Sequence, residues 1–166
     1  MTPVTATTTI SDLEDFLAEI EAISEATGAT IQCFDANYVA GDRHLSRAVE
    51  LAARAYEQGT AVARDPAVEI LLYAAGRRQI NQALEMGVSE GEGDVVAVVT
   101  DGDEAAAEQR VRKLLGGTDA GDTGVSPGDA DTIKMFFDIG DREVAVVDGD
   151  LEDIVLERVA LLDVET

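Results

Sequence analysis

The segment that most constrains the fold of this chain is residues 66–75, PAVEILLYAA. Asp65 followed by Pro66 is a strong helix start, because aspartate can accept a free amide hydrogen and proline suits the first helical position. Residues 68–75 are almost entirely apolar, so a helix here has little polar face to expose. We therefore predict a central, buried helix around which the other elements pack.

The residues after this helix are unusually rich in basic and amide groups. Gly76 is expected to break or kink the helix, and residues 77–86, RRQINQALEM, to resume it. Successive residues of a helix are about 100° apart, so Ile80, Ala83 and Leu84 would share an apolar face. The opposite face would carry Arg77, Arg78, Asn81, Gln82 and Glu85. We predict that this polar face is a binding surface.

The rest of the chain is strongly acidic. Thirty-four acids oppose twelve bases, of which ten are arginine and only Lys113 and Lys134 are lysine. A highly charged surface keeps proteins soluble in molar salt, so the composition indicates a halophilic organism. Attraction of a basic partner is the weaker interpretation, because the acids are spread along the chain and not gathered in a tail. Residues 41–84, with six arginines and five acids, are a local exception.

Length and hydrophobic content predict one compact domain over residues 1–166. Hydrophobic residues make up 46% of the chain, which is enough for a core. No apolar run approaches the roughly 18 residues of a membrane span, and the amino terminus lacks the pattern of a secretory signal. We therefore expect a cytoplasmic protein that does not associate with membranes.

Local patterns predict an α+β fold, with a small mixed or antiparallel sheet packed with several helices. Strands are expected at residues 4–10 (an edge strand), 30–34 and 94–100 (an inner strand). Apolar residues at helical spacing predict further helices at 13–27, 42–58, 104–115, 133–137 and 151–164. Ser11 and Glu14 fit a capping box for the first of these helices, and Asp42 fits a cap for the second.

Two segments have weaker signals. Residues 116–131 are rich in glycine and aspartate with few apolar groups, which predicts an exposed, flexible acidic loop. Residues 143–147 have the composition of a strand and the surroundings of a helix. Both interpretations of that segment stay open.

Cysteine and histidine each occur once. Cys33 lies in a predicted buried strand, and we interpret it as a small core residue. A single cysteine permits neither an internal disulfide nor a cysteine-based zinc site. His44 lies in the first turn of the helix predicted at residues 42–58. A structural hydrogen bond is the preferred interpretation for His44, and contact with a ligand is the alternative.

The sequence contains no motif that indicates catalysis, a cofactor or a metal. Residues 91–93, GEG, precede a predicted strand, so they are no dinucleotide-binding fingerprint. Residues 148–150, DGD, are not followed by the glycine and glutamate that an EF-hand loop requires. Residues 101–104, DGDE, could hold a hard cation, but a helix start attracts acids in any case. We therefore predict a non-enzymatic protein with no cofactor and no metal.

Several runs resemble one known family in the same order. They are ANYVAG at residues 36–41, followed by His44-Leu45, EILLYAAGRRQI at 69–80, ALEMGV at 83–88 and VLERVALLD at 155–163. These runs resemble the TPRKB-type, PRPK-binding subunit of the archaeal KEOPS complex, and the likeness spans about residues 10–164. The extreme acidity and the loop at 116–131 depart from the family, and we interpret them as salt adaptation and an insertion.

The resemblance implies a non-catalytic subunit of the assembly that installs threonylcarbamoyl on the adenosine next to the anticodon of tRNA. Such subunits bind the PRPK-like atypical kinase/ATPase of the complex, and in archaea they hold the single-stranded 3′ CCA end of tRNA. An unpaired RNA end is recognised by stacking and by hydrogen bonds to base edges, which arginine and amide side chains supply. The predicted RNA-binding residues are Arg77, Arg78, Asn81, Gln82 and His44.

Other hypotheses stay open. The chain could be a protein scaffold or kinase regulator without RNA contact, or a metal-dependent enzyme that uses its aspartate clusters. Arg77 and Arg78 could also merely pair with Glu69 or Glu85. The sequence assigns no kinase-docking surface, and exposed apolar residues of the helices at 42–58 and 151–164 are the candidates. If Arg77 and Arg78 contact RNA, reversing both charges should weaken tRNA binding and leave the fold intact.

Overall fold

The computed structural model describes residues 1–116, 125–146 and 150–164. The chain divides into two compact units, Met1–Ala36 with Gly87–Val125, and Asn37–Met86 with Ser126–Thr166. In the part that is described, all strands belong to the first unit, whereas the second unit is helical. The fold is therefore α+β, as the sequence predicts. The assignment of residues 1–166 to one domain stays a prediction.

The sheet of the first unit is antiparallel, with the strand order β1-β3-β2. The strands are β1 (Thr2–Ile10), β2 (Thr30–Asp35) and β3 (Gly91–Thr100). The β-branched run of β3 predicts an inner strand and that of β1 an edge strand, and both predictions are confirmed. However, β3 begins at Gly91 and not at residue 94, because Ile10 pairs with Gly91. Glycines have no side chain, so no hydrophobic pattern marks that early part.

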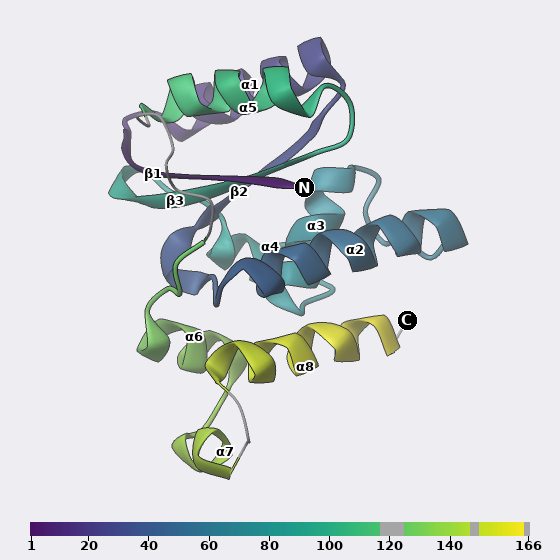
Figure 1. Cartoon of the computed structure of the whole chain (residues 1–166), viewed down its shortest axis with the longest axis vertical. Coiled ribbons are helices and arrows are strands. Elements are labelled where there is room, and N and C mark those ends of the chain that lie inside the picture. The colour runs from purple at the N-terminus through teal and green to yellow at the C-terminus, as the bar shows by residue number, and fades with distance from the viewer. Residues whose placement is uncertain (117–124, 147–149, 165–166) are drawn as a thin grey trace. The chain divides into compact units, whose positions relative to one another are not determined.

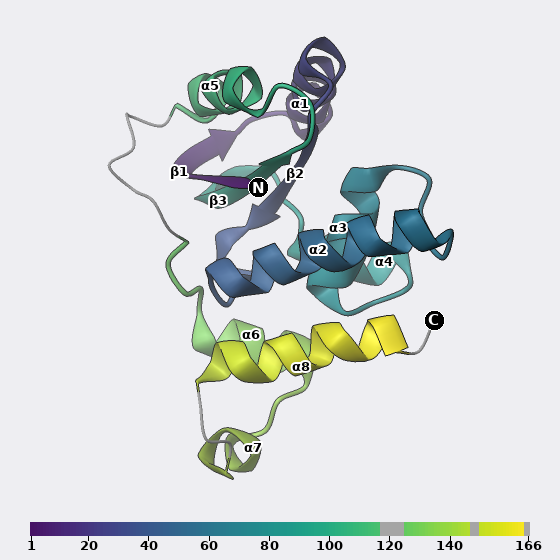
Figure 2. The same cartoon turned by 45° about the vertical axis from the view of Figure 1, so that its right-hand side comes forward.

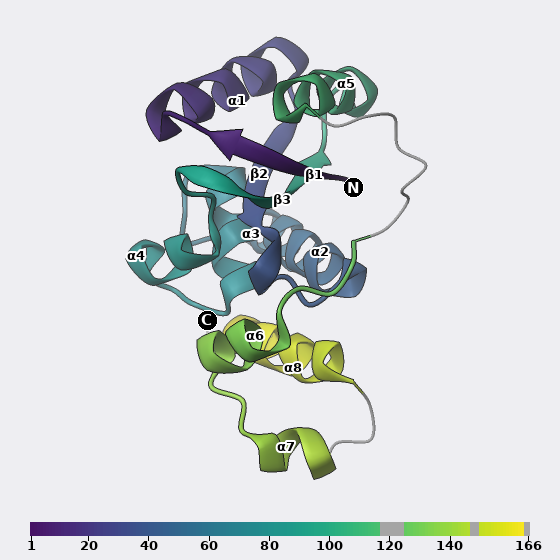
Figure 3. The same ribbon diagram turned by 90° about the vertical axis from the view of Figure 1, so that its left-hand side faces the viewer.

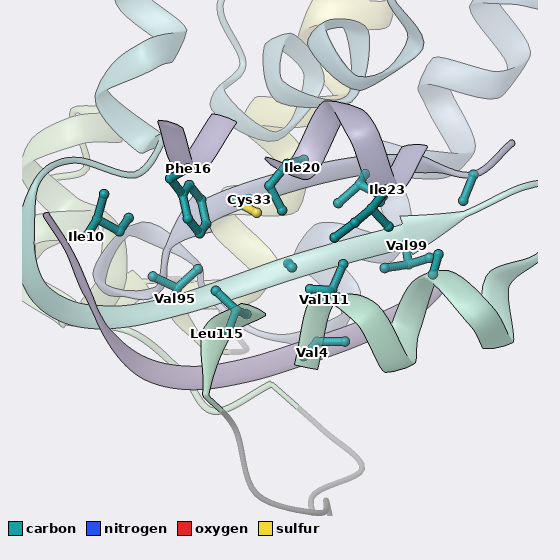
Figure 4. Packing of buried hydrophobic residues seen from close by; sticks show 14 residues of the cluster. Val4, Ile10, Phe16, Ile20, Ile23, Cys33, Val95, Val99, Val111 and Leu115 are labelled. Carbon is teal, nitrogen blue, oxygen red and sulfur yellow. The ribbon is translucent and has the colours of Figure 1, made fainter. Parts of the chain in front are cut away.

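Helices α1 (Leu13–Thr27) and α5 (Glu104–Leu115) lie side by side on one face of this sheet (Figures 1 and 3). Their apolar faces and the facing side chains of the strands form a core that includes Phe16, Ile20, Val99 and Val111 (Figure 4). Cys33 belongs to the same core, and burial raises the pKa of its thiol to about 12. The interpretation of Cys33 as a core residue is confirmed.

The cap of α1 lies one residue later than the sequence predicts. Asp12, and not Ser11, accepts a hydrogen bond from the backbone amide of Asp15 at 3.2 Å. A second carboxylate helps to fix this helix start, because the Leu13 amide donates to Glu90 at 3.0 Å. Both Ser11 and Asp12 have the chemistry of a cap, so the local sequence could not choose between them.

Acidic residues 101–104 form the start of α5. Asp103 is the cap and accepts from the amide of Ala106 at 3.2 Å, which agrees with the helix-start interpretation. Gly102 has a positive φ of 56° and packs against the backbone of Gly28, where a Cβ atom would collide. Close approach of two backbones therefore explains the glycine in this segment.

The second unit contains α2 (Asp42–Gln58), α3 (Pro66–Ala75), α4 (Ile80–Ala83), α6 (Ala130–Phe137), α7 (Asp141–Val146) and α8 (Leu151–Val164). Helix α2 packs against α3 and α8, and α6 lies beside α8 (Figures 2 and 3). Asp65 caps α3, Pro66 is its first residue, and residues 69–75 are all buried. The prediction of a central, buried helix at residues 66–75 is confirmed.

Helix α2 is capped from a distant part of the chain. Its N-cap residue is Gly41, one position before the predicted Asp42, and it has no side chain to offer. The carboxylate of Glu152 in α8 accepts instead from the His44 amide at 3.2 Å and pairs with Arg43 at 2.9 Å. A Cβ atom on Gly41 would collide with that carboxylate, so glycine is needed for this approach. No local pattern could have indicated a cap supplied by α8.

The structure also decides the two segments with weaker signals. Residues 143–146 are helical, as part of α7, and residue 147 lies outside the described residues. Residues 117–124 of the predicted flexible loop also lie outside them. Residues 130 and 131 are helical and not part of a loop, because α6 begins at Ala130, and the Gly128 amide donates to the Val39 carbonyl at 2.7 Å. The predicted flexibility of this segment stays a prediction.

Candidate functional site

The backbone leaves the helical path where the predicted binding surface begins. Gly76 ends α3 with a left-handed φ of 62°, and its amide donates to the carbonyls of Leu72 and Tyr73. Arg77 and Arg78 follow in an irregular turn, and α4 occupies only Ile80–Ala83 before a 3₁₀ turn at Leu84–Met86. The prediction of one helix over residues 77–86 is therefore wrong.

The apolar face assigned to that helix is also wrong. Ala83 and Met86 are buried, whereas Ile80 and Leu84 are 48% and 57% exposed. A continuous helix would have turned Ile80 and Leu84 inward together with Ala83, but the short α4 and the 3₁₀ turn have different periods. Two large apolar side chains therefore lie exposed among the polar residues of this segment.

Arg77 is anchored to the end of α6. Its guanidinium donates to the Phe136 carbonyl, and its Cζ atom lies 4.7 Å from the centre of the Phe136 ring. Arg158 donates to the neighbouring Phe137 carbonyl at 3.3 Å. Two cations therefore satisfy carbonyls at the end of α6, where the helix dipole favours positive charge. Arg77 therefore stabilises the packing of α6 and also lines the pocket described below.

Arg78, Asn81 and Gln82 are exposed. Arg78 has no ion pair within 4.0 Å in the described part of the chain, so the ion-pair alternative finds no support there. The carboxylate of Glu69 is not available to either arginine, because it is buried and accepts from the backbone amides of Val62 and Ala63. Arg78 is therefore the most accessible of the predicted RNA-binding cations.

An open pocket of about 710 Å³ lies next to Arg77 in the second unit. Its volume falls within the range of typical small-ligand sites, about 300–1,000 Å³. The described residues that line it are Tyr38, Arg77, Gln82, Glu85, Asp131, Thr132, Met135 and Phe136. The rings of Tyr38 and Phe136 meet edge to face at 5.5 Å, and Met135 is 85% exposed. Flat apolar groups, one guanidinium, an amide and two carboxylates thus share one pocket.

The pocket contains only part of the predicted site. Arg77 and Gln82 line it, Arg78 and Asn81 lie close to it in sequence but do not line it, and His44 lies elsewhere. The residues that sequence reasoning missed come from the turn at residues 36–38 and from α6. Tyr38 carried a signal, because it belongs to one of the runs that resemble the family. The α6 residues had none, because only folding brings them to Arg77.

His44 is fully buried and makes structural hydrogen bonds with both ring nitrogens. The Ala40 amide donates to Nδ1 at 3.0 Å, which places the proton on Nε2, and Nε2 donates to the Ala74 carbonyl at 2.7 Å. Burial lowers the pKa of His44 to about 4, although the bond to Ala74 acts to raise it. This geometry agrees with the preferred structural interpretation, and we leave His44 out of the proposed binding site.

The low pKa of His44 predicts an acid-sensitive stability. In the unfolded chain, His44 binds a proton when the pH falls below its ordinary pKa of 6.5. In the folded chain it binds that proton only near pH 4, so the free energy of unfolding decreases as the pH falls from 6.5 to about 4. We expect wild type to lose about 2 kcal/mol more than His44→Gln between pH 8 and pH 5. Urea unfolding of both proteins at the two pH values measures this difference, since carboxylate titration is common to both. Equal losses would contradict the buried neutral ring.

The described residues contain no group of three or more His, Cys, Asp or Glu side chains that could hold a metal ion. Among the helices in this same part of the chain, none has the length and apolar character that crossing a membrane requires. Among the described residues, those that line the pocket beside Arg77 bring together a guanidinium, an amide and two carboxylates.

Fold and pocket together define a small α+β protein with an open pocket on its helical unit. The chain belongs to the kinase binding protein CGI-121 family, whose family model matches residues 8–163. This match spans most of both units and includes every described residue that lines the pocket. The comparison with curated proteins gives no match.

Proposed function

We propose that this chain is the kinase-binding subunit of an archaeal KEOPS complex and that it also holds the 3′ CCA end of tRNA. Its kinase partner would be the PRPK-like atypical kinase/ATPase of that complex. Membership of the CGI-121 family over nearly the whole chain supports the kinase partner. In this role the chain contributes binding and leaves catalysis to other subunits.

One observation carries the RNA part of the proposal, namely the composition of the pocket beside Arg77. Single-stranded RNA is recognised when unstacked bases lie against flat side chains and donate or accept hydrogen bonds at their edges. Tyr38 supplies aromatic surface, and Arg77 and Gln82 supply donors within the same pocket, where the buried Phe136 ring supports the Arg77 guanidinium. Exposed Arg78 follows directly in sequence and is available to a phosphate.

The acidity of the chain supports a halophilic source and affects how RNA would be bound. In molar salt the Debye length is about 3 Å, so distant charges attract RNA weakly. Close contacts by planar arginine side chains then matter more than the summed charge, which is −22 in this chain. Binding experiments therefore belong in molar KCl.

Reconstitution of the complex tests the proposed function. The chain should elute together with its PRPK-like kinase in gel filtration, and threonylcarbamoylation of tRNA should fall when the chain is omitted. Kinase binding without any effect on tRNA would instead support the scaffold hypothesis. Failure to bind the kinase would contradict the proposed function as a whole.

The kinase-docking surface is a separate question. Among the exposed apolar side chains of α2 and α8 are Tyr56, which is 37% exposed, and Leu161, which is 51% exposed. Both residues are suitable first positions for substitutions when kinase binding is mapped.

A further inference from the structure

The charge of the pocket beside Arg77 is unexpected for a site that binds RNA. Two of its described lining residues, Glu85 and Asp131, are exposed carboxylates, and neither forms an ion pair in the described part of the chain. The one cation that lines it, Arg77, already contacts the carbonyl and the ring of Phe136. The pocket therefore carries more negative than positive charge.

This arrangement does not suit a phosphate group. Phosphates are bound by arginine, lysine and free amide groups, often at a helix N-terminus. Here the start of α6 is occupied by its own acid, because the Thr132 amide donates to the Asp129 carboxylate at 3.0 Å. Asp131 adds a second carboxylate in the same first turn. A group that enters this pocket should be uncharged or positively charged.

The nucleoside at the 3′ end of an RNA chain is an uncharged group of this kind. Each internal nucleotide carries a phosphate on both sides, whereas the last nucleoside has a phosphate only on its 5′ side and ends in free ribose hydroxyls. Carboxylates accept hydrogen bonds from hydroxyl groups but repel phosphates. The ring of Tyr38 and the exposed side chain of Met135 suit the base, and Arg78, outside the lining, suits the phosphate on the 5′ side.

We propose that the pocket receives the terminal nucleoside of the RNA 3′ end and that Glu85 and Asp131 select a free 3′ hydroxyl against a 3′ phosphate. This inference rests on the proposed function, in which the chain holds the 3′ end of tRNA. It adds a chemical requirement on that end. A tRNA whose end still carries a phosphate binds this subunit more weakly than a tRNA with a free 3′ hydroxyl.

Binding of three tRNA transcripts to the full chain tests this selection. They are identical except that one ends in CCA with a free hydroxyl, one ends in CCA with a 3′ phosphate, and one lacks CCA. We expect the 3′ phosphate to weaken binding about tenfold relative to the free hydroxyl, since a phosphate would face two carboxylates. The double variant Glu85→Gln with Asp131→Asn should reduce this difference to less than about twofold.

A matched control removes two charges elsewhere. Glu21→Gln with Glu25→Gln changes two exposed acids of α1, and the preference for the free hydroxyl should persist. Thermal unfolding of each variant verifies that it is folded. The comparison of the three transcripts on the wild-type chain tests the selection even if a variant fails to fold.

The outcomes separate the two proposals. Equal binding of all three transcripts would contradict RNA-end binding itself. Dependence on CCA without dependence on the 3′ phosphate would overturn the selection and leave the proposed function standing. A phosphate effect that survives in the Glu85→Gln, Asp131→Asn variant would overturn the role of the two acids.

Discussion

Arg78→Glu is expected to weaken binding of tRNA about tenfold or more while the free energy of unfolding changes by less than about 0.5 kcal/mol. The side chain of Arg78 is exposed and forms no ion pair in the described part of the chain, so its reversal removes little from the fold. A phosphate or base contact, by contrast, would become a repulsion. Titration of labelled tRNA, together with urea unfolding, measures both quantities.

The control for Arg78 lies at the opposite end of α3. Arg64 is also exposed and precedes the helix, so Arg64→Glu changes the net charge equally at a distance from the pocket residues that follow α3. We expect its effect on tRNA binding to be less than about threefold. Equal losses in both variants would mean that net charge, and not a local contact, controls binding.

Arg77 is a poorer test residue than its neighbour. Its contacts with the Phe136 carbonyl and ring contribute to the packing of α6, so Arg77→Glu disturbs the fold and the pocket together. The paired reversal of Arg77 and Arg78, which the sequence suggests, would therefore mix two causes. Arg78→Glu alone separates RNA binding from stability.

Glu69→Ala is expected to lower the free energy of unfolding by about 3 kcal/mol. Glu69 is 2% exposed, and its carboxylate accepts from the amides of Val62 at 3.1 Å and Ala63 at 2.9 Å. Alanine leaves two part-buried amides without this acceptor, and an unpaired donor costs about 1–3 kcal/mol where it is cut off from water. Urea unfolding at constant salt measures the loss.

Two comparisons sharpen the Glu69 experiment. Glu69→Gln keeps one oxygen acceptor, but its NH₂ group would face two backbone amides that also donate. We therefore expect the free energy of unfolding to fall by less than it does for Glu69→Ala. Glu57→Ala, at the exposed end of α2, should change stability by less than about 0.5 kcal/mol. A loss of less than 1 kcal/mol for Glu69→Ala would contradict the role of this carboxylate as an anchor for the α2–α3 connection.

Local physical chemistry explains which parts of the fold could be predicted. The boundaries of α5 and α8 agree with the predictions, because apolar spacing and charged starts mark these helices. The inner position of β3 was predicted from its apolar character on both faces. The helix boundaries depend on interactions between residues that are neighbours in the sequence. The inner strand is recognisable because both faces of any inner strand are buried and therefore apolar.

Other failures have a different cause, which is contact between segments far apart in the sequence. Arg77 finds its partner in Phe136, and the cap of α2 comes from Glu152 in α8. Gly76 also ended α3 completely, where the sequence allowed either a break or a kink. Because α3 ends there, residues 77–86 do not form one helix, and the apolar and polar faces predicted for that helix do not exist.

The candidate site could be predicted only in part for the same reason. The density of arginine and amide groups drew attention to residues 77–82, and two of these line the pocket. The aromatic ring of Phe136 and the carboxylate of Asp131 belong to α6, which is separated by many residues from Arg77. No spacing rule connects such segments, so the acidic side of the pocket could not be foreseen.

The most direct test of the central proposal is binding of the wild-type chain, in molar KCl, to one tRNA with and without its terminal CCA. Recognition of an unpaired end predicts that removing these three nucleotides weakens binding about tenfold or more, since stacking contributes about 1–3 kcal/mol per base. Unchanged affinity after CCA removal would contradict the proposal that this chain holds the tRNA 3′ end.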